Sequence, residues 1–142
     1  MSRVQLALNV RNLQESIAFY SKMFGTEPAK VREGYANFAI SEPPLKLVLI
    51  ETKSDGVSEY QHLNHLGVEL ESAQLVEQAI DTFSDLGLVE KIEKNETCCF
   101  AVQDKVWMTS PDGAPWEYYT VLADAPAFRT NIAVLPGGDC CS

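Results

Sequence analysis

Apolar positions near the N-terminus first alternate and then recur at helical spacing. Residues 4–8 alternate large apolar side chains with polar or small ones, a period of two that predicts a strand. Asn12 follows as a candidate helix N-cap, with Glu15 three residues later, and Gly25 is a candidate stop. Between cap and stop runs an apolar stripe at helical spacing, formed by Leu13, Ile17, Tyr20 and Phe24. The pattern predicts a strand followed by an amphipathic helix of about three turns.

The second half of the chain repeats this order. A strand-like segment at 65–70 precedes a helix cap at Ser72 and a stop at Gly87. The apolar stripe of this second helix comprises Leu75, Val76, Ala79, Ile80 and Phe83. Strands are also predicted after each helix, at 35–40 and 45–50 in the first half and at 88–91, 98–102, 106–109 and 116–122 in the second. Turn-forming segments at 41–44 and 110–113 separate neighbouring strands.

Two polar residues occupy matched places in this repeat. Gln5 lies seven residues before Asn12, and His65 lies seven residues before Ser72, which defines an internal repeat of about 60 residues. We therefore predict an α+β domain at 1–123, made of two βαβββ modules at about 3–51 and 63–122. Residues 124–142 show no period and end in Asp-Cys-Cys-Ser, so a flexible tail is predicted there.

Composition narrows the function classes. A chain of 142 residues with 46% hydrophobic content is long enough for one packed core. Its 11 basic and 20 acidic residues give a net charge of −9, which disfavours nucleic acid as a partner. The N-terminus lacks the apolar run of a secretory signal, and the longest apolar run, at 47–50, is far too short to cross a membrane. A cytoplasmic protein with reduced thiols is expected.

The matched residues also suggest a metal site. Histidine is a common ligand for transition metals, although a lone His65 is equally consistent with a hydrogen-bonded residue without a catalytic role. Glu117 lies among aromatic and β-branched residues, where a carboxylate must face solvent or find a strong partner. Together with Gln5 these side chains form a candidate three-ligand site with open positions for substrate or dioxygen. Lys46 is the polar side chain of the corresponding first-half strand, so a fourth ligand is not expected, and His62 is interpreted as a solvated loop residue.

The four cysteines occur as two adjacent pairs. Neighbouring cysteines rarely bond to each other, because closing such a small ring strains the backbone, so Cys98 and Cys99 are expected to be free. Two close thiolates suit a soft, thiophilic ion or metalloid. The alternative is a buried small hydrophobe with a bystander. The pair recurs at Cys140 and Cys141, where it is either an accessory trap or without function.

Several longer segments resemble a known family. They are Val-Gln-Leu-Ala-Leu-Asn-Val, Gly-Tyr-Ala-Asn-Phe-Ala-Ile, Pro-Pro-Leu-Lys-Leu-Val-Leu, Asn-His-Leu-Gly-Val-Glu, Thr-Cys-Cys-Phe-Ala-Val-Gln-Asp-Lys-Val-Trp and Ser-Pro-Asp-Gly-Ala-Pro-Trp-Glu-Tyr-Tyr. With the repeated modules, they resemble the vicinal oxygen chelate superfamily over about residues 3–122, and most of all its organoarsenical carbon-arsenic lyases and cadmium-induced proteins. Many extradiol dioxygenases of the superfamily have histidine where this chain has Gln5.

The resemblance implies both a fold and a reaction. The fold is a curved mixed sheet around a metal-binding cleft. The reaction is that of a nonheme Fe(II) dioxygenase, which uses dioxygen to cleave the carbon-arsenic bond of trivalent organoarsenicals, such as methylarsenite and reduced aromatic arsenicals. The products are arsenite and, from methyl substrates, formaldehyde. The resemblance further implies that Gln5, His65 and Glu117 bind the metal and that Cys98 and Cys99 bind arsenic; no catalytic residue beyond these ligands is expected.

Two other functions fit many of the same features. A binding protein of the cadmium-induced type would use the cysteine pair to sequester a soft ion without any reaction. A glyoxalase-like isomerase or thiol transferase would leave the cysteine pair without a purpose and would lack its fourth ligand. The expected partner is a small molecule, with neither nucleic acid nor membrane involved, and the protein is expected to be a monomer or a homodimer.

Overall fold

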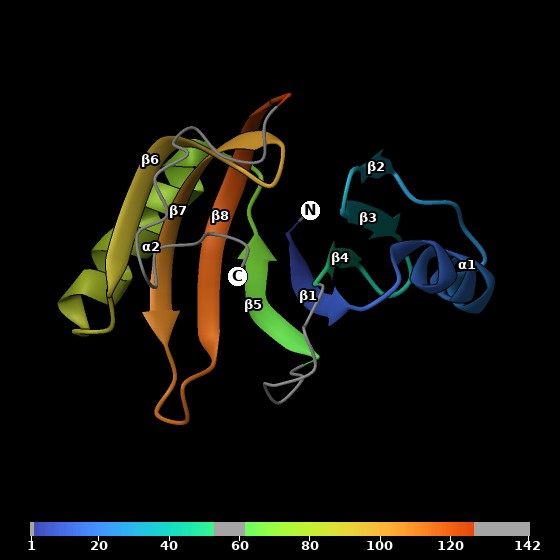
Figure 1. The fold of residues 1–142 in the computed structure, drawn as a ribbon. Coiled ribbons are helices and arrows are strands. Elements are labelled where there is room, and N and C mark those ends of the chain that lie inside the picture. The colour runs from blue at the N-terminus through green and yellow to red at the C-terminus, as the bar shows by residue number, and fades with distance from the viewer. Residues whose placement is uncertain (1, 53–61, 127–142) are drawn as a thin grey trace.

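Two successive βαβββ modules form one mixed sheet (Figure 1). The computed structural model describes residues 2–52 and 62–126. Within them the eight strands follow the order β2-β3-β4-β1-β5-β8-β7-β6. The elements are β1 (Arg3–Val10), α1 (Leu13–Phe24), β2 (Lys30–Arg32), β3 (Tyr35–Ile40), β4 (Leu45–Glu51), β5 (Leu63–Glu69), α2 (Ala73–Asp85), β6 (Lys91–Cys98), β7 (Ala101–Thr109) and β8 (Pro115–Asp124). The predicted α+β class and the two modules are confirmed.

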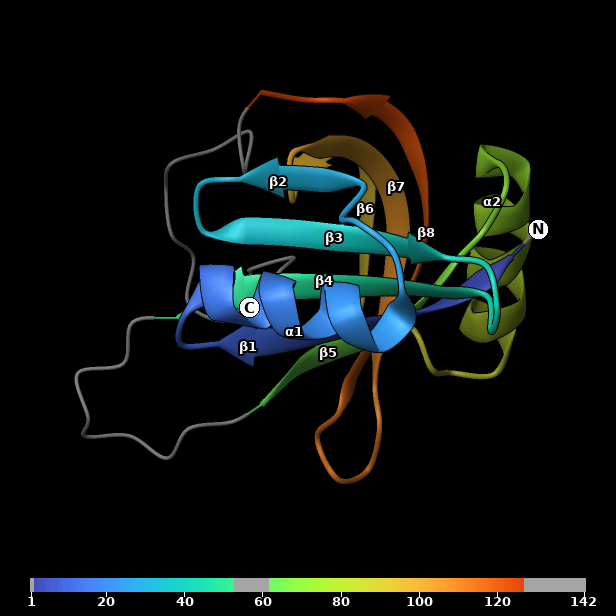
Figure 2. The same cartoon turned by 90° about the vertical axis from the view of Figure 1, so that its right-hand side faces the viewer.

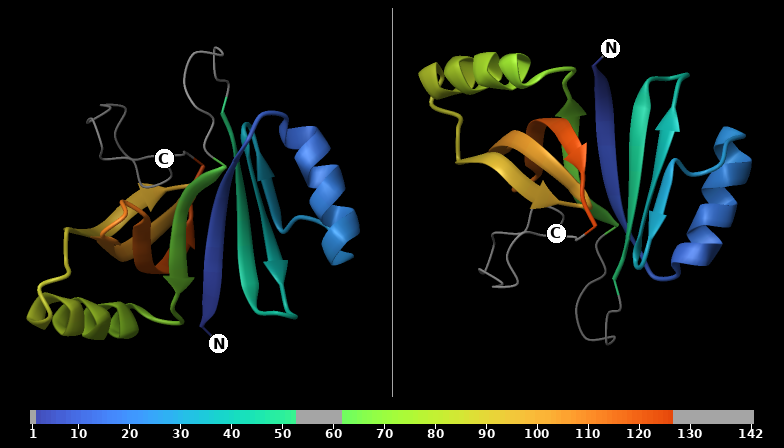
Figure 3. Two further views of the ribbon diagram at one scale, coloured as in Figure 1. Left: turned by 90° about the horizontal axis from the view of Figure 1, so that it is seen from below. Right: turned by 90° about the horizontal axis from the view of Figure 1, so that it is seen from above.

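The first strand of each module lies at the centre of the sheet. β1 is antiparallel to β5, while β1 pairs in parallel with β4 and β5 pairs in parallel with β8. The sheet curls, so that one face is concave and the other is convex (Figure 3). Helix α1 contacts β3 and β4, helix α2 contacts β7 and β8, and both lie outside the curve (Figures 2 and 3). The concave face is thus left to side chains from the central strands.

The helix boundaries follow from local capping chemistry. The Asn12 side chain accepts a hydrogen bond from the backbone N–H of Glu15 at 2.9 Å, and Ser72 accepts one from Leu75 at 3.2 Å. Gly25 ends α1 in the left-handed conformation, with φ of 63°. The predicted caps are therefore confirmed. Within the two described segments, neither helix is long and apolar enough to cross a membrane.

Two strand predictions in the second module are wrong. The chain at 88–91 is extended only from Lys91 onwards, and 98–102 spans a turn between β6 and β7 rather than one strand. β6 is an edge strand whose side chains are mostly polar or exposed, so it lacks the apolar alternation on which sequence-based prediction relies. The edge strand β2, only three residues long, was missed for the same reason.

Both helices cover apolar clusters on the convex face. The cluster under α1 contains Val10, Leu13, Ala36, Phe38, Ile40, Leu47 and Leu49. The cluster under α2 contains Val76, Ile80 and Val106, with Phe83 and Tyr118 packed against it. Because these clusters bury the helix stripes, the predicted periodicity and the observed core agree.

Replacing Phe38 by alanine should lower the free energy of unfolding by about 3–5 kcal/mol, because the ring is fully buried and leaves a cavity. The matched control is Phe19→Ala on α1, where the ring is 59% exposed and the change should stay within about 0.5 kcal/mol. Urea denaturation of both variants measures the difference. Equal losses would contradict the assignment of this core.

Candidate functional site

The predicted metal ligands lie on three neighbouring strands at the centre of the sheet. In the ladder Gln5 of β1 pairs with Gly67 of β5, and Gly67 pairs with Glu117 of β8. His65 lies two residues before Gly67 and so faces the same side of the sheet. All three predicted ligands are at most 4% exposed. Gln5 and His65, the matched residues of the sequence repeat, thus lie with Glu117 in one buried cluster.

The three side chains are in direct contact. Gln5 Nε2 lies 3.0 Å from His65 Nε2 and donates a hydrogen bond to Glu117 Oε1 at 2.9 Å. His65 Nε2 and Glu117 Oε1 are 3.4 Å apart. The other ring nitrogen, His65 Nδ1, contacts Asn64 Oδ1 at 2.8 Å, which fixes the ring orientation.

This spacing suits an octahedral metal ion. Adjacent ligands at about 2.1 Å from such an ion are about 3.0 Å apart, close to the separations within the cluster. Imidazole, carboxylate and amide oxygen are a borderline-to-hard donor set, appropriate for Fe(II) or Mn(II). In 2–52 and 62–126 no group of three His, Cys, Asp or Glu side chains is placed to hold a metal. The cluster itself contains two such side chains, His65 and Glu117, beside the amide of Gln5.

Gly67 keeps space open between two of these ligands. A Cβ atom at this position would lie 2.9 Å from Glu117 Cγ and 3.4 Å from Gln5 Nε2. It would also lie 2.9 Å from the backbone oxygen of Glu117, which cannot move independently of the ladder. Gly67 leaves no signal of this role in the sequence, because the role is visible only once β1, β5 and β8 are side by side.

Lys105 is the cation that neutralises Glu117. Its ammonium donates to Glu117 Oε2 at 2.9 Å, and the lysine is fully buried. Burial by itself raises the pKa of Glu117, but the positive charge of Lys105 and the hydrogen bond with His65 outweigh it and lower the pKa to about 2. Lys91, on the neighbouring strand β6, pairs instead with Glu93, at 3.4 Å.

A second polar network supports Gln5 from the other side. The Tyr119 hydroxyl donates to Gln5 Oε1 and lies 2.9 Å from Glu69 Oε2. Glu69 also binds Lys46 at 3.1 Å and Arg3 at 3.0 Å. Lys46 is therefore engaged in an ion pair with Glu69. Burial and the nearby carboxylates raise the pKa of Tyr119 well above its ordinary value, which keeps the phenol protonated.

Cys98 and Cys99 lie at a tight hairpin turn. Cys98 ends β6, and Cys99 and Phe100 both adopt left-handed backbone conformations, with φ of 52° and 62°. Two such residues in a two-residue loop are normally Asn or Gly, and other residues there cost about 1–2 kcal/mol each. The Phe100 carbonyl accepts hydrogen bonds from Lys30 Nζ at 3.1 Å and from the backbone N–H of Ala125 at 2.9 Å. Tertiary contacts thus hold the turn in a strained form.

One apolar cluster joins the cysteine pair to the ligand cluster. Cys98 is buried with Ala7 and Val48, and Trp107 packs against the same group. The Trp107 ring also meets the His65 ring edge-on, with centroids 5.4 Å apart. The cysteine pair and the cluster of predicted metal ligands therefore border the same apolar interior.

The oxidation state of this pair differs from the expectation. Cys98 and Cys99 are both disulfide-bonded in the structure, whereas the sequence predicted free thiols. Their own sulfur atoms are 3.5 Å apart, longer than the ~2.05 Å of a disulfide, so the two neighbours are not bonded to each other. Thiol chemistry at this turn therefore belongs to the reduced protein. Cys140 and Cys141 lie outside the described residues.

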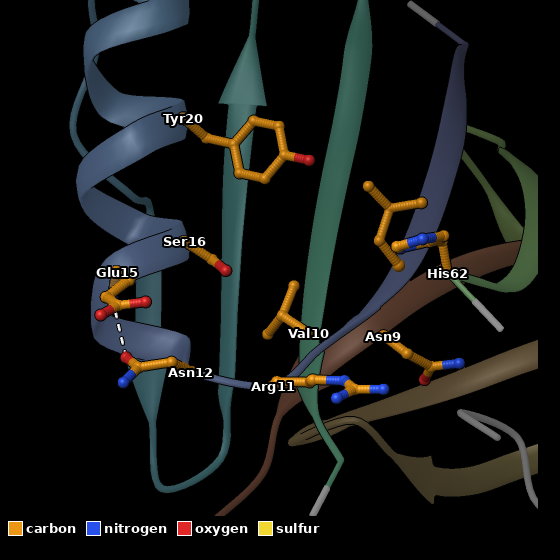
Figure 4. A pocket seen from close by; sticks show the side chains of 9 residues that line it. Asn9, Val10, Arg11, Asn12, Glu15, Ser16, Tyr20 and His62 are labelled. Atoms are coloured by element: carbon orange, nitrogen blue, oxygen red, sulfur yellow. Dashed lines mark hydrogen bonds between the residues drawn. The ribbon is translucent and has the colours of Figure 1, made fainter. Parts of the chain in front are cut away.

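A separate cavity of about 720 Å³ lies beside α1 (Figure 4). His62, exposed as expected, contributes to its wall together with Tyr20 and Ser16 of the helix. Asn12 and Glu15 also line this cavity, and their hydrogen bond is the helix cap already described. None of the predicted metal ligands reaches it. This cavity is distinct from the candidate metal site.

Comparison with known proteins adds independent support for the fold. The model of the Glyoxalase/Bleomycin resistance protein/Dioxygenase superfamily matches residues 3–118. The cadmium-induced protein CadI of Mycobacterium tuberculosis is 56% identical over 92% of this chain and 84% of its own length. The trivalent organoarsenical cleaving enzyme of Thermomonospora curvata is 50% identical over 99% of this chain and 100% of its own. The Mn(II)-bound glyoxalase of Novosphingobium aromaticivorans, 18% identical, superposes with a TM-score of 0.61 over 88% of this chain and 42% of that one.

Gly67→Ala should displace the Glu117 side chain and weaken divalent metal binding at least tenfold, because the new methyl group enters the ligand cluster. Isothermal titration with Mn(II) measures the effect. Gly113→Ala is the control: nothing lies within 4 Å of its added Cβ, and although its φ of 89° strains the turn, metal affinity should be unchanged. Unaltered affinity in Gly67→Ala would contradict the site.

Lys105→Met should lower the free energy of unfolding at neutral pH by roughly 3–5 kcal/mol, because it leaves the Glu117 carboxylate buried without its cation. In the wild-type protein the depressed pKa of Glu117 contributes stability above its ordinary value of 4.5 that is lost as pH falls toward about 2. In the variant burial raises this pKa, so stability should instead recover as pH falls and the carboxyl group is protonated.

Urea denaturation at several pH values tests the reversed dependence. Lys94→Met is the matched control, because its ion pair with Glu77 is exposed and worth at most about 1 kcal/mol. A Lys105→Met variant as stable as this control would contradict the role assigned to the buried pair.

Proposed function

Because the chain belongs to the Glyoxalase/Bleomycin resistance protein/Dioxygenase superfamily, we propose that it is an Fe(II)-dependent dioxygenase that cleaves the carbon-arsenic bond of trivalent organoarsenicals. Methylarsenite and reduced aromatic arsenicals are the proposed substrates, and arsenite is the product. The observation that carries the proposal is a buried Gln5, His65 and Glu117 cluster that shares an apolar interior with a cysteine pair. The relative from Thermomonospora curvata, whose name states this activity, supports it.

In this proposal the three buried side chains hold the metal. Gln5 would contribute its amide oxygen, His65 its Nε2 atom and Glu117 its Oε1 atom, since Glu117 Oε2 is held by the Lys105 ammonium. Bound there, Fe(II) would supply the capacity to activate dioxygen. The Glu117 carboxylate and the Lys105 ammonium have opposite charges, so the metal-free cluster carries little net charge. This small net charge limits the electrostatic attraction between the cluster and an incoming cation.

The cysteines would position arsenic. In the reduced protein the thiols of Cys98 and Cys99 displace two hydroxyl groups from trivalent arsenic, forming two As–S bonds and releasing two water molecules. The strained turn keeps the sulfurs adjacent, so little further ordering is needed on binding. The Trp107 ring, packed between this cluster and His65, limits the entry of water. A freely diffusing substrate is thereby converted into a positioned one.

The overall reaction balances for a methyl substrate. Methylarsenite, as CH3As(OH)2, and dioxygen contain the same atoms as arsenous acid and formaldehyde together. The methyl carbon is oxidised, dioxygen is reduced, and arsenic stays trivalent. Dioxygen is therefore a co-substrate and no other oxidant is required. A reducing cytoplasm would keep the cysteine pair as thiols, and we place the protein there as a monomer or homodimer.

A second candidate function is sequestration of a soft metal ion without a reaction. It is favoured by the 56% identity to a protein named for cadmium induction and by the same cysteine pair. Incubation of the reduced protein with Fe(II), dioxygen and methylarsenite separates the two. Arsenite release that stops without dioxygen or after chelation of iron supports the enzyme, whereas tight binding with no arsenite would establish sequestration instead.

Cys98→Ser and Cys99→Ser should each reduce arsenite release at least a hundredfold, because one thiol cannot hold arsenic at two points. Fe(II) affinity should stay within about threefold of wild type in both, since neither residue is a proposed ligand. Arsenite is quantified by chromatography with mass detection. The matched control is the double variant Cys140→Ser/Cys141→Ser, in which activity should persist. Activity retained in both Cys98→Ser and Cys99→Ser would refute the thiol role.

A further inference from the structure

The amide of Gln5 presents the wrong atom to a metal. Its nitrogen, Nε2, faces His65 Nε2 and Glu117 Oε1, while its oxygen, Oε1, faces the Tyr119 hydroxyl. An amide NH2 group is a hydrogen-bond donor with no lone pair to offer, so it occupies the cluster in the place of a cation. A metal ion can use Gln5 as a ligand only when the amide oxygen faces inward.

The Tyr119 hydroxyl can also hydrogen-bond to the Gln5 amide in the opposite orientation, with the amide nitrogen facing the phenol. Its oxygen is within reach of both Gln5 Oε1 and Glu69 Oε2, yet a phenol has only one proton to donate. When that proton goes to Gln5 Oε1, the short contact with Glu69 is left without a hydrogen. When it goes to Glu69, the phenol oxygen becomes free to accept a hydrogen bond from an NH2 group at Gln5.

Glu69 is held in place for the second arrangement. Lys46 binds its Oε2 atom at 3.1 Å, and Arg3 binds its Oε1 atom at 3.0 Å. Lys46 also lies over the Tyr119 ring, 5.2 Å from the centroid. A carboxylate anchored by two cations stays where it can accept the Tyr119 proton whichever way Gln5 is turned.

We propose that metal binding turns the Gln5 carboxamide by about half a revolution, and that Tyr119 is the positioning residue that locks it. Without metal, Gln5 donates to Glu117 and accepts from Tyr119. With metal, Gln5 Oε1 faces the ion, Gln5 Nε2 donates to the Tyr119 oxygen, and Tyr119 donates to Glu69. The turn exchanges one set of hydrogen bonds for another, and the contact between Tyr119 and Glu69 gains its hydrogen only in the metal-bound state. The inference rests on the proposed metal site.

The zinc affinities of four proteins test whether Tyr119 holds the turned Gln5 carboxamide in place. The four proteins are wild type, Tyr119→Phe, Gln5→Glu and the double variant. Zn(II) is used because it is diamagnetic and needs no dioxygen. Tyr119→Phe should weaken binding tenfold to a hundredfold, the usual effect of removing a partner that orients a ligand. In the Gln5→Glu background both carboxylate oxygens are equivalent, no turn is needed, and the same substitution should change affinity by less than about threefold.

Nuclear magnetic resonance with 15N-labelled glutamine reports the turn directly. The Gln5 NH2 protons, identified by their loss in Gln5→Glu, should gain cross-relaxation to the Tyr119 ring when Zn(II) is added and lose contact with the His65 ring. Tyr118→Phe is the matched control, because this residue packs against Phe83 under α2 and should alter neither signal nor affinity.

The outcomes separate this inference from the proposed function. If His65→Ala leaves zinc affinity unchanged, the cluster is not the metal site and both fail. If His65→Ala abolishes binding while Tyr119→Phe binds zinc as tightly as wild type, or the NH2 protons keep their contacts, the lock is refuted and the metal site stands. An equal loss from Tyr119→Phe in the wild-type and Gln5→Glu backgrounds would also overturn it, because it would reveal a merely structural role.

Discussion

Glu117 and Lys105 face each other across β8 and β7 with almost no exposure to solvent. A buried carboxylate is costly unless it is paired and hydrogen-bonded, and here Lys105, Gln5 and His65 are its polar partners. Lys105 occupies one carboxylate oxygen, so the other is directed at Gln5 and His65. The geometry of the candidate metal site is therefore a consequence of how one charge is accommodated inside the sheet.

The convex face of the curled sheet contributes to stability, and the concave face carries the candidate site. The convex face buries the apolar stripes of both helices, which supplies the hydrophobic free energy of folding. The concave face can then tolerate polar groups that contribute less to stability, provided that they satisfy one another. Gly67 shows how tight this arrangement is, because a single methyl group has no room between strands that carry the ligands.

The cysteine turn and the ligand cluster are connected by packing rather than by hydrogen bonds. Trp107 contacts His65 on one side and the cluster around Cys98 on the other. Strain at Cys99 and Phe100 is compensated by the contacts of Phe100 with Tyr35, Lys30 and Ala125. In the proposed reaction this shared apolar interior is where an arsenic atom held by sulfur would meet a metal held by oxygen and nitrogen.

Periodicity and spacing by themselves determined the two modules, both helices with their N-caps, and the matched places of Gln5 and His65, because these signals are local or repeat along the chain. Glu117 was a candidate for a different reason, since an acidic residue there stands among aromatic and β-branched ones. The edge strands and the turn at Cys99 were missed, since polar edges and strained turns leave no apolar pattern. Only the tertiary structure decided that Lys105 neutralises Glu117, that Tyr119 and Glu69 support Gln5, and that Gly67 must lack a side chain. Those roles arise from contacts between strands far apart in sequence, and no local pattern encodes which side chain a folded sheet will place opposite a buried charge.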